Sequence, residues 1–138
     1  MDLRKKTEMI VVHCAATKPS MDIGASEIKK WHVDDNGWDD IGYHYIIKRG
    51  GLVEVGRPEA FQGAHAPAAN SKSIGICLVG GMSEDGDDEN NFTIEQFLSL
   101  KDLLKRLLMT NSNIQEIVGH CDIQDNKPNC PGFNLKEW

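Results

Sequence analysis

Long apolar segments are missing from this chain. No run approaches the ~20 consecutive apolar residues that a membrane-spanning helix requires. Residues 1–8 carry charge early, but they lack the apolar stretch of about 7–15 residues and the small-residue cleavage site of a secretory signal. We therefore expect no membrane insertion and a protein that is cytoplasmic when it is synthesised.

Cysteine and basic residues are also in short supply. The four cysteines, at positions 14, 77, 121 and 130, form no Cys-x-x-Cys pair, which argues against a disulfide scaffold and favours reduced thiols. The 15 lysines and arginines are outnumbered by 21 aspartates and glutamates, for a net charge of −6. Because this sign repels phosphate backbones, nucleic acid is not an expected partner.

The 138 residues are enough for one domain with a hydrophobic core of its own. Hydrophobic residues make up 40% of the chain and charged residues 26%, within the range of folded globular proteins. The sequence contains no recognisable linker or internal repeat. We therefore expect a single domain spanning residues 1–138, with residues 1–8 as a loose N-terminal arm.

Local patterns predict alternating strands and helices. Residues 9–13 form a short, continuously apolar run, typical of a strand that is buried on both faces. Thr93 followed by Gln96 forms a capping box, and apolar residues recur at helical spacing after it. The full prediction places strands at 9–13, 43–47, 52–55, 73–79 and 114–119, helices at 26–32 and 94–109, and a long loop at 56–72. This order favours an α/β domain with a mixed central β-sheet and helices packed on it.

Two histidines stand at predicted strand ends, and a cysteine follows the second of them. His13 ends the first strand, His120 follows the last, and Cys130 lies ten residues further along. Imidazole and thiolate groups are preferred zinc ligands, and three protein ligands leave a fourth position open for catalysis. The spacing alone is weak evidence for a metal site, because a single histidine is more often hydrogen-bonded than metal-bound and a single cysteine is more often a buried thiol.

Longer segments of the chain carry a more specific signal. In order and spacing they resemble the T-odd phage lysozyme type of N-acetylmuramoyl-L-alanine amidase, whose fold peptidoglycan recognition proteins share. The resemblance runs from about residue 9 to residue 138 and is carried by residues 12–20, 31–32, 42–49, 63–66, 73–81, 130–131, 133 and 138.

The resemblance implies one zinc ion per chain, held by His13, His120 and Cys130. It also implies catalytic roles for Tyr43, in the Gly-Tyr-His segment, and for a lysine shortly before the cysteine ligand. Here that lysine is Lys127, three residues before Cys130, where close phage relatives have it two residues before. Zinc supplies hydroxide near neutral pH, a lysine stabilises oxygen charge that develops on the attacked amide, and a tyrosine holds the attacking water or relays a proton.

The roles of two further residues, Tyr45 and His65, stay open. Strand alternation places Tyr45 on the same face as Tyr43, so the pattern alone does not choose between the two tyrosines, whereas the resemblance favours Tyr43. His65 lies in the long loop, where matching family positions are near the cleft. Substrate contact and a surface role are both compatible with its position.

We therefore expect a zinc amidase that cuts the bond between N-acetylmuramic acid and L-alanine in peptidoglycan. The missing secretory signal fits a phage or prophage endolysin that lyses the cell wall after the membrane has been breached; a bacterial housekeeping amidase is an alternative origin. Two other functions stay open: a peptidoglycan recognition module without turnover, and an amidase that also regulates a phage RNA polymerase. A monomer is the default expectation.

Overall fold

The computed structural model describes residues 1–124, 130–133 and 135. Five strands form one sheet in the order β3-β2-β4-β1-β5. Strand β1 pairs in parallel with β4 and β5, β2 pairs in parallel with β4, and β2 and β3 form an antiparallel hairpin. The strands are β1 (Met9–Cys14), β2 (Tyr45–Ile47), β3 (Val53–Val55), β4 (Ser73–Leu78) and β5 (Glu116–Gly119). The predicted α/β fold with a mixed central sheet is confirmed.

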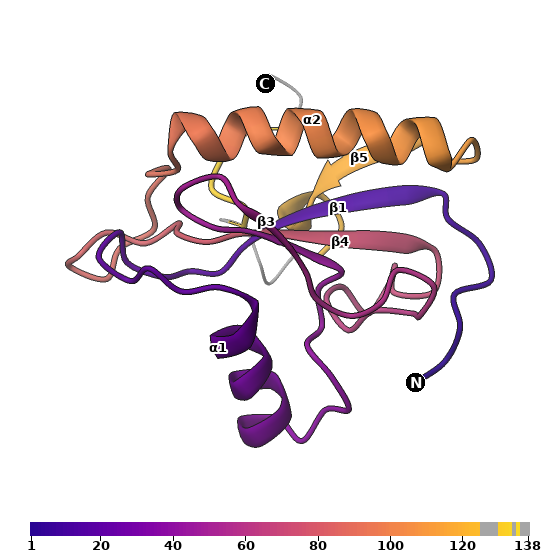
Figure 1. Ribbon diagram of the computed structural model, residues 1–138, viewed down its shortest axis with the longest axis horizontal. Coiled ribbons are helices and arrows are strands. Elements are labelled where there is room, and N and C mark those ends of the chain that lie inside the picture. Colours follow the sequence, from indigo (N-terminus) through magenta and orange to yellow (C-terminus); the bar gives the residue numbers. More distant parts are fainter. Residues whose placement is uncertain (125–129, 134, 136–138) are drawn as a thin grey trace.

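Helix α2 (Ile94–Thr110) covers one face of the sheet (Figure 1). Its N-terminus has the predicted capping box: Thr93 Oγ1 accepts the Gln96 N–H at 3.0 Å, and Gln96 Oε1 accepts the Thr93 N–H at 3.0 Å. Leucines on the inner side of α2 pack on apolar side chains from β1, β2 and β4. This cluster contains Ile10, Val12, Ile47, Ile74, Ile76, Leu78, Leu100, Leu103, Leu104 and Leu107.

Helix α1 (Ala25–Lys30) lies on the other side of the sheet and continues into the single π-helical turn η1 (Trp31–Asp35) (Figure 1). Ile28 of α1 is buried against Ile46 of β2 and Cys77 of β4. Among the described residues, no helix is long and apolar enough to cross a membrane.

Strand alternation divides β1 and β4 between these two faces. In β1, Ile10 and Val12 point into the cluster under α2, whereas Val11 belongs to a cluster on the opposite face. His13 has the same parity as Val11 and therefore points away from α2. In the register of the pair, His13 lies opposite Cys77. The face that α2 leaves open thus receives the first predicted metal ligand.

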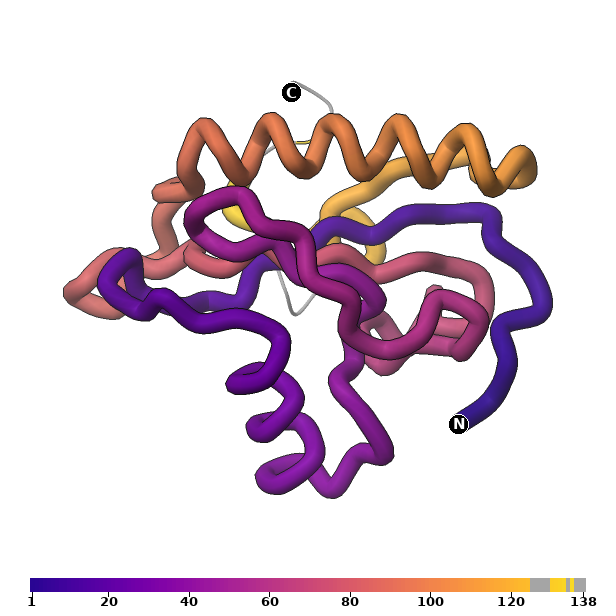
Figure 2. The backbone as a smooth tube through the Cα atoms, in the orientation of Figure 1, coloured from indigo at the N-terminus to yellow at the C-terminus, as the bar shows by residue number. Residues whose placement is uncertain are grey.

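The N-terminal segment runs along the long loop between β3 and β4 (Figure 2). Leu3 forms an isolated β-bridge with Phe61, and the Arg4 N–H donates to the carbonyl of Ala60 at 2.8 Å. Residues 3–4 therefore run beside the loop as a short strand-like segment, although the five-stranded sheet itself ends at β3.

Strand β2 begins at Tyr45, two residues later than predicted, and β5 begins at Glu116 instead of residue 114. The prediction that Tyr43 and Tyr45 share a face is wrong. Tyr45 packs against the α2 cluster, whereas Tyr43 packs with the cluster around Ile28. The chain bends at His44, whose buried Nδ1 accepts the Gly75 N–H at 3.0 Å. This bend interrupts the alternation, so a strand pattern extended through residue 43 assigns the wrong side.

Candidate metal centre and active site

The carboxyl ends of β1 and β5 bring two histidines together. His13 is the fifth residue of β1, and His120 begins the short 3-10 helix η2 (His120–Asp122) directly after β5. Because the two strands are parallel neighbours, their ends meet at the same edge of the sheet. The Nδ1 atoms of the two imidazoles lie 3.0 Å apart, and both side chains are buried.

Cys130 joins this pair from a distant part of the chain. The Cys14 N–H donates to Sγ of Cys130 at 3.2 Å, and the Cys121 N–H donates to its carbonyl at 2.7 Å. Gly119 leaves room for the following proline, since a Cβ there would lie 2.8 Å from Cδ of Pro131. The cysteine is thus held by the ends of both histidine-bearing strands.

His13, His120 and Cys130 offer three ligand atoms that all lie within 4.8 Å of one another. Two nitrogens bound tetrahedrally to one zinc ion at about 2.0–2.1 Å are about 3.3 Å apart, close to the separation of the two imidazoles. Without a cation, the hydrogen bond with the Cys14 thiol raises the pKa of Cys130, and burial raises it further. A bound cation favours the thiolate instead. The donor types and their separation therefore fit a metal ion.

Each histidine also has a polar partner on the side away from the cluster. Nε2 of His13 lies 2.8 Å from Nδ1 of His65, and Nε2 of His120 contacts Oε1 of Gln124. His65 is only 8% exposed, and burial together with neighbouring charged groups lowers its pKa to about 3. The sequence led us to expect substrate contact or a surface role for His65, and in the structure its buried ring lies beside that of His13. Gln124 was not predicted; the only local signal for it is its position one helical turn after His120.

Tyr43 borders the cluster on the side of α1. Its ring centroid lies 5.1 Å from that of His13 and 5.6 Å from that of His32. Burial is the main reason why the pKa of Tyr43 lies well above its ordinary value. The phenol is therefore neutral at physiological pH and acts as a hydrogen-bond donor or acceptor. Tyr45 points elsewhere, with its hydroxyl donating to the carboxylate of Glu59.

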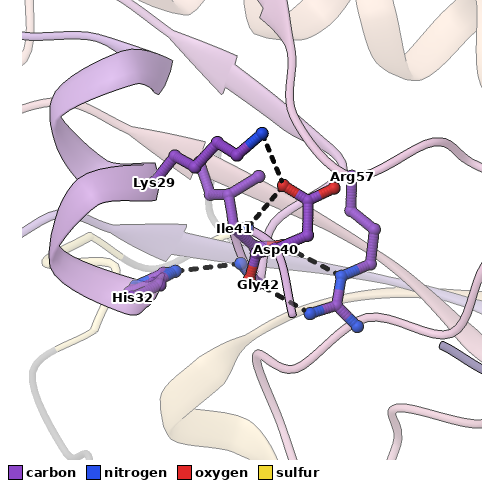
Figure 3. A network of polar contacts seen from close by, with 6 residues as sticks. All are labelled: Lys29, His32, Asp40, Ile41, Gly42 and Arg57. Atoms are coloured by element: carbon purple, nitrogen blue, oxygen red, sulfur yellow. Dashed lines mark hydrogen bonds and ion pairs between the residues drawn. The ribbon is translucent and has the colours of Figure 1, made fainter. Parts of the chain in front are cut away.

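A polar network fixes the three residues that precede Tyr43 (Figure 3). The buried Arg57 guanidinium donates to the carbonyls of Ile41 at 2.9 Å and Asp40 at 3.2 Å, while Nδ1 of His32 accepts the Gly42 N–H at 2.9 Å. The Asp40 carboxylate lies 3.5 Å from the Lys29 ammonium group. This segment connects α1 to β2 and sets the position of the tyrosine.

The other three cysteines do not belong to the cluster of His13, His120 and Cys130. Cys77 is a fully buried core thiol, and neither Cys14 nor Cys121 belongs to the group that could hold a metal ion. All four cysteines lie in the described part of the chain and are free thiols. Lys127, the predicted cation of the site, lies outside the described residues.

Comparisons with known proteins show the family of this chain and its fold. A family model described as N-acetylmuramoyl-L-alanine amidase matches residues 3–133. The chain is 47% identical over 135 residues to the endolysin of Enterobacteria phage T3. The match covers 98% of this chain and 87% of that protein. A solved endolysin amidase, LysCS from Clostridium intestinale, superposes with a TM-score of 0.80 at 31% identity, covering 96% of this chain and 80% of that one. The recognition protein PGRP-SA of Apis mellifera, at 18% identity, shares the fold with a TM-score of 0.80.

Proposed function

The chain belongs to the N-acetylmuramoyl-L-alanine amidase family, and we propose that it does its chemistry with one zinc ion held by His13, His120 and Cys130. The enzyme hydrolyses the amide between the lactyl group of N-acetylmuramic acid and L-alanine in peptidoglycan. The observation that supports the metal assignment is the convergence of two buried imidazole nitrogens and one thiol sulfur within 4.8 Å.

Residues around the cluster have separate roles in the hydrolysis of the amide. When bound, zinc supplies hydroxide near neutral pH and polarises the carbonyl of the amide. Tyr43, kept neutral by burial, holds the attacking water by a hydrogen bond beside His13. We assign to Lys127, on the family pattern, the stabilisation of oxygen charge that develops on the attacked carbonyl.

In the cell, we propose the role of a phage or prophage endolysin, an enzyme that reaches the wall once the membrane has been breached. Peptidoglycan is the partner that the family implies. Regulation of a phage RNA polymerase and a monomeric state stay predictions. The recognition-module alternative is disfavoured because Cys130, the ligand that such modules lack, stands beside the two histidines.

Metal content and turnover test the zinc assignment together. The purified protein should contain about one zinc ion per chain, chelation should abolish lysis of cell walls, and added zinc should restore it. Cys130→Ser should weaken zinc binding because the soft thiolate is lost. Cys121→Ser is the matched control, since Cys121 lies outside the cluster. Equal zinc affinity in the two variants would contradict the proposal.

The cleaved bond is identified by its products. Digestion of peptidoglycan should release new N-terminal alanine amines in step with the fall in turbidity, without new reducing sugar ends. A glycosidase would need two carboxylates flanking the sugar bond, and the metal cluster contains none. New reducing ends without new alanine termini would refute amide cleavage.

A further inference from the structure

The imidazole of His65 links the metal cluster to strand β4. Its Nδ1 lies 2.8 Å from Nε2 of His13, and its Nε2 lies 3.3 Å from the hydroxyl oxygen of Ser73, the first residue of β4. That hydroxyl donates to the carbonyl of Ala69 at 2.7 Å. A continuous line of hydrogen bonds therefore runs from a backbone carbonyl to the outer nitrogen of His13.

The line has one consistent direction. A carbonyl only accepts, and the single hydroxyl hydrogen of Ser73 belongs to its shorter contact, with Ala69. Oγ of Ser73 then accepts the Nε2–H of His65, which leaves Nδ1 of His65 as an acceptor, because a neutral imidazole has one N–H and one lone pair. His13 therefore donates its Nε2–H and turns an unprotonated Nδ1 towards His120.

The backbone around His65 is shaped for this ring. A Cβ at Gly75 would lie 2.6 Å from two ring atoms of His65, so only glycine at that position of β4 leaves room for the imidazole. Oδ1 of Asn70 accepts the N–H groups of His65 and Ala66 at 3.0 and 2.8 Å, which fixes the loop that carries the ring. With 8% of its surface exposed, His65 has little area to offer a substrate.

From this geometry we infer that His65 is a positioning residue, which fixes the tautomer and orientation of His13 so that Nδ1 faces the metal. The inference rests on the proposed role of His13 as a ligand. An acceptor on the outer N–H of a ligating histidine orients the ring and raises its basicity, and losing such a partner typically weakens metal binding by about 10–100-fold. The same contact does nothing for substrate binding directly.

Two substitutions of similar size separate hydrogen bonding from packing. His65→Leu removes the acceptor, whereas His65→Asn places a carbonyl oxygen near the position of Nδ1, and both variants lose the contact with Ser73. We expect the zinc dissociation constant, measured by competition with a chromophoric chelator, to rise about 10–100-fold in His65→Leu. His65→Asn should recover most of this loss. Equal affinities in these two variants would overturn the inference.

A second measurement needs neither zinc nor a substitution. Two-bond ¹H–¹⁵N correlation spectra of the metal-free wild-type protein report which nitrogen of each histidine carries hydrogen. His13 and His65 should both be Nε2–H tautomers. Ser73→Ala should let His65 populate its Nδ1–H form. An Nδ1–H tautomer of His13 in the metal-free wild-type protein would overturn the inference even if His65→Leu failed to fold.

Controls distinguish this inference from the proposed function. Leu100→Ala creates a cavity under α2, on the face of the sheet opposite His65, and should leave zinc affinity unchanged. If the wild-type protein binds no zinc, or His13→Ala binds it as tightly as the wild type, the proposed metal site itself fails. If the wild type binds zinc and His65→Leu binds it equally well while KM for a soluble muropeptide rises, His65 is a substrate contact and the positioning role is wrong.

Discussion

His44 should make the protein lose stability between neutral and mildly acidic pH. The side chain is fully buried, its Nδ1 accepts the Gly75 N–H, and its Nε2 donates to the carbonyl of Phe61 at 2.7 Å. Burial lowers its pKa from 6.5 to about 4, with a smaller contribution from the nearby Arg4 guanidinium and against the effect of the Phe61 hydrogen bond. The folded protein thus holds His44 neutral at pH values where the unfolded chain protonates it.

The sign and size of the effect follow from this difference in pKa. Because the folded-state pKa is the lower one, the stabilisation is complete above the unfolded value of 6.5 and is lost as the pH falls towards about 4. Moving from about pH 7 to about pH 5 should reduce the free energy of unfolding by about 2 kcal/mol through His44 alone.

Urea denaturation of the wild type and of His44→Asn at these two pH values isolates the contribution of His44 to the pH dependence of stability. A chelator keeps both proteins metal-free, so proton competition for the metal ligands does not enter, and the other titrating groups cancel in the comparison. His44→Asn keeps an acceptor for the Gly75 N–H but loses the bond to Phe61, so it should be less stable at neutral pH. Its loss of stability on acidification should be smaller than that of the wild type by about 2 kcal/mol. Equal losses in the two proteins would show that His44 does not titrate as its burial requires.

Four further substitutions test other parts of the structure. Thr93→Ala removes the acceptor for the Gln96 N–H at the start of α2 and should lower the free energy of unfolding by about 1–2 kcal/mol in urea titrations, with kcat unchanged. Leu100→Ala leaves a cavity under α2 and should cost about 2–5 kcal/mol by the same measurement. Arg57→Lys keeps the positive charge but loses the planar guanidinium group, which donates to two carbonyls in the segment before Tyr43. In this variant kcat/KM in a cell-wall assay should fall, while the zinc content stays at one per chain. Tyr43→Phe should also retain zinc while kcat falls on the order of 10²-fold.

Most of the fold could be predicted because its signals are local. The continuous apolar run of β1 and the Thr93–Gln96 capping box each lie within a few residues, and both elements occur where the pattern indicated. The positions of His13 and His120 at strand ends are local signals too, but their convergence depends on β1 and β5 becoming parallel neighbours, and only the family resemblance implied that the two histidines meet. Alternation failed at residue 43, because the bend at His44 depends on a side-chain bond to a different strand.

The role of His65 could not be predicted for a related reason. Its position depends on the missing side chain of Gly75 and on the Ser73 hydroxyl, two residues of a strand that local patterns describe only as buried. A glycine within an apolar strand signals that something approaches the backbone closely, but it does not say what. The approaching group becomes known only when the loop from β3 to β4 is placed on the sheet.

Strand alternation in β4 places the residues that stabilise the fold and the residues that shape the metal cluster on opposite faces of the sheet. In β4, three alternate side chains pack under α2: Ile74, Ile76 and Leu78. The other three, Ser73, Gly75 and Cys77, face the side of the sheet that carries the metal cluster. The first set can vary among apolar residues of similar volume, since packing under a helix tolerates such exchanges. At Gly75 even one added methyl group meets the His65 ring at 2.6 Å. Gly75→Ala should therefore lower zinc affinity more than Ile76→Val does, although Ile76→Val removes a methylene group from the core. Chelator competition on the two variants measures the difference, and a larger loss of affinity in Ile76→Val would show that the site depends on general packing and not on the position of His65.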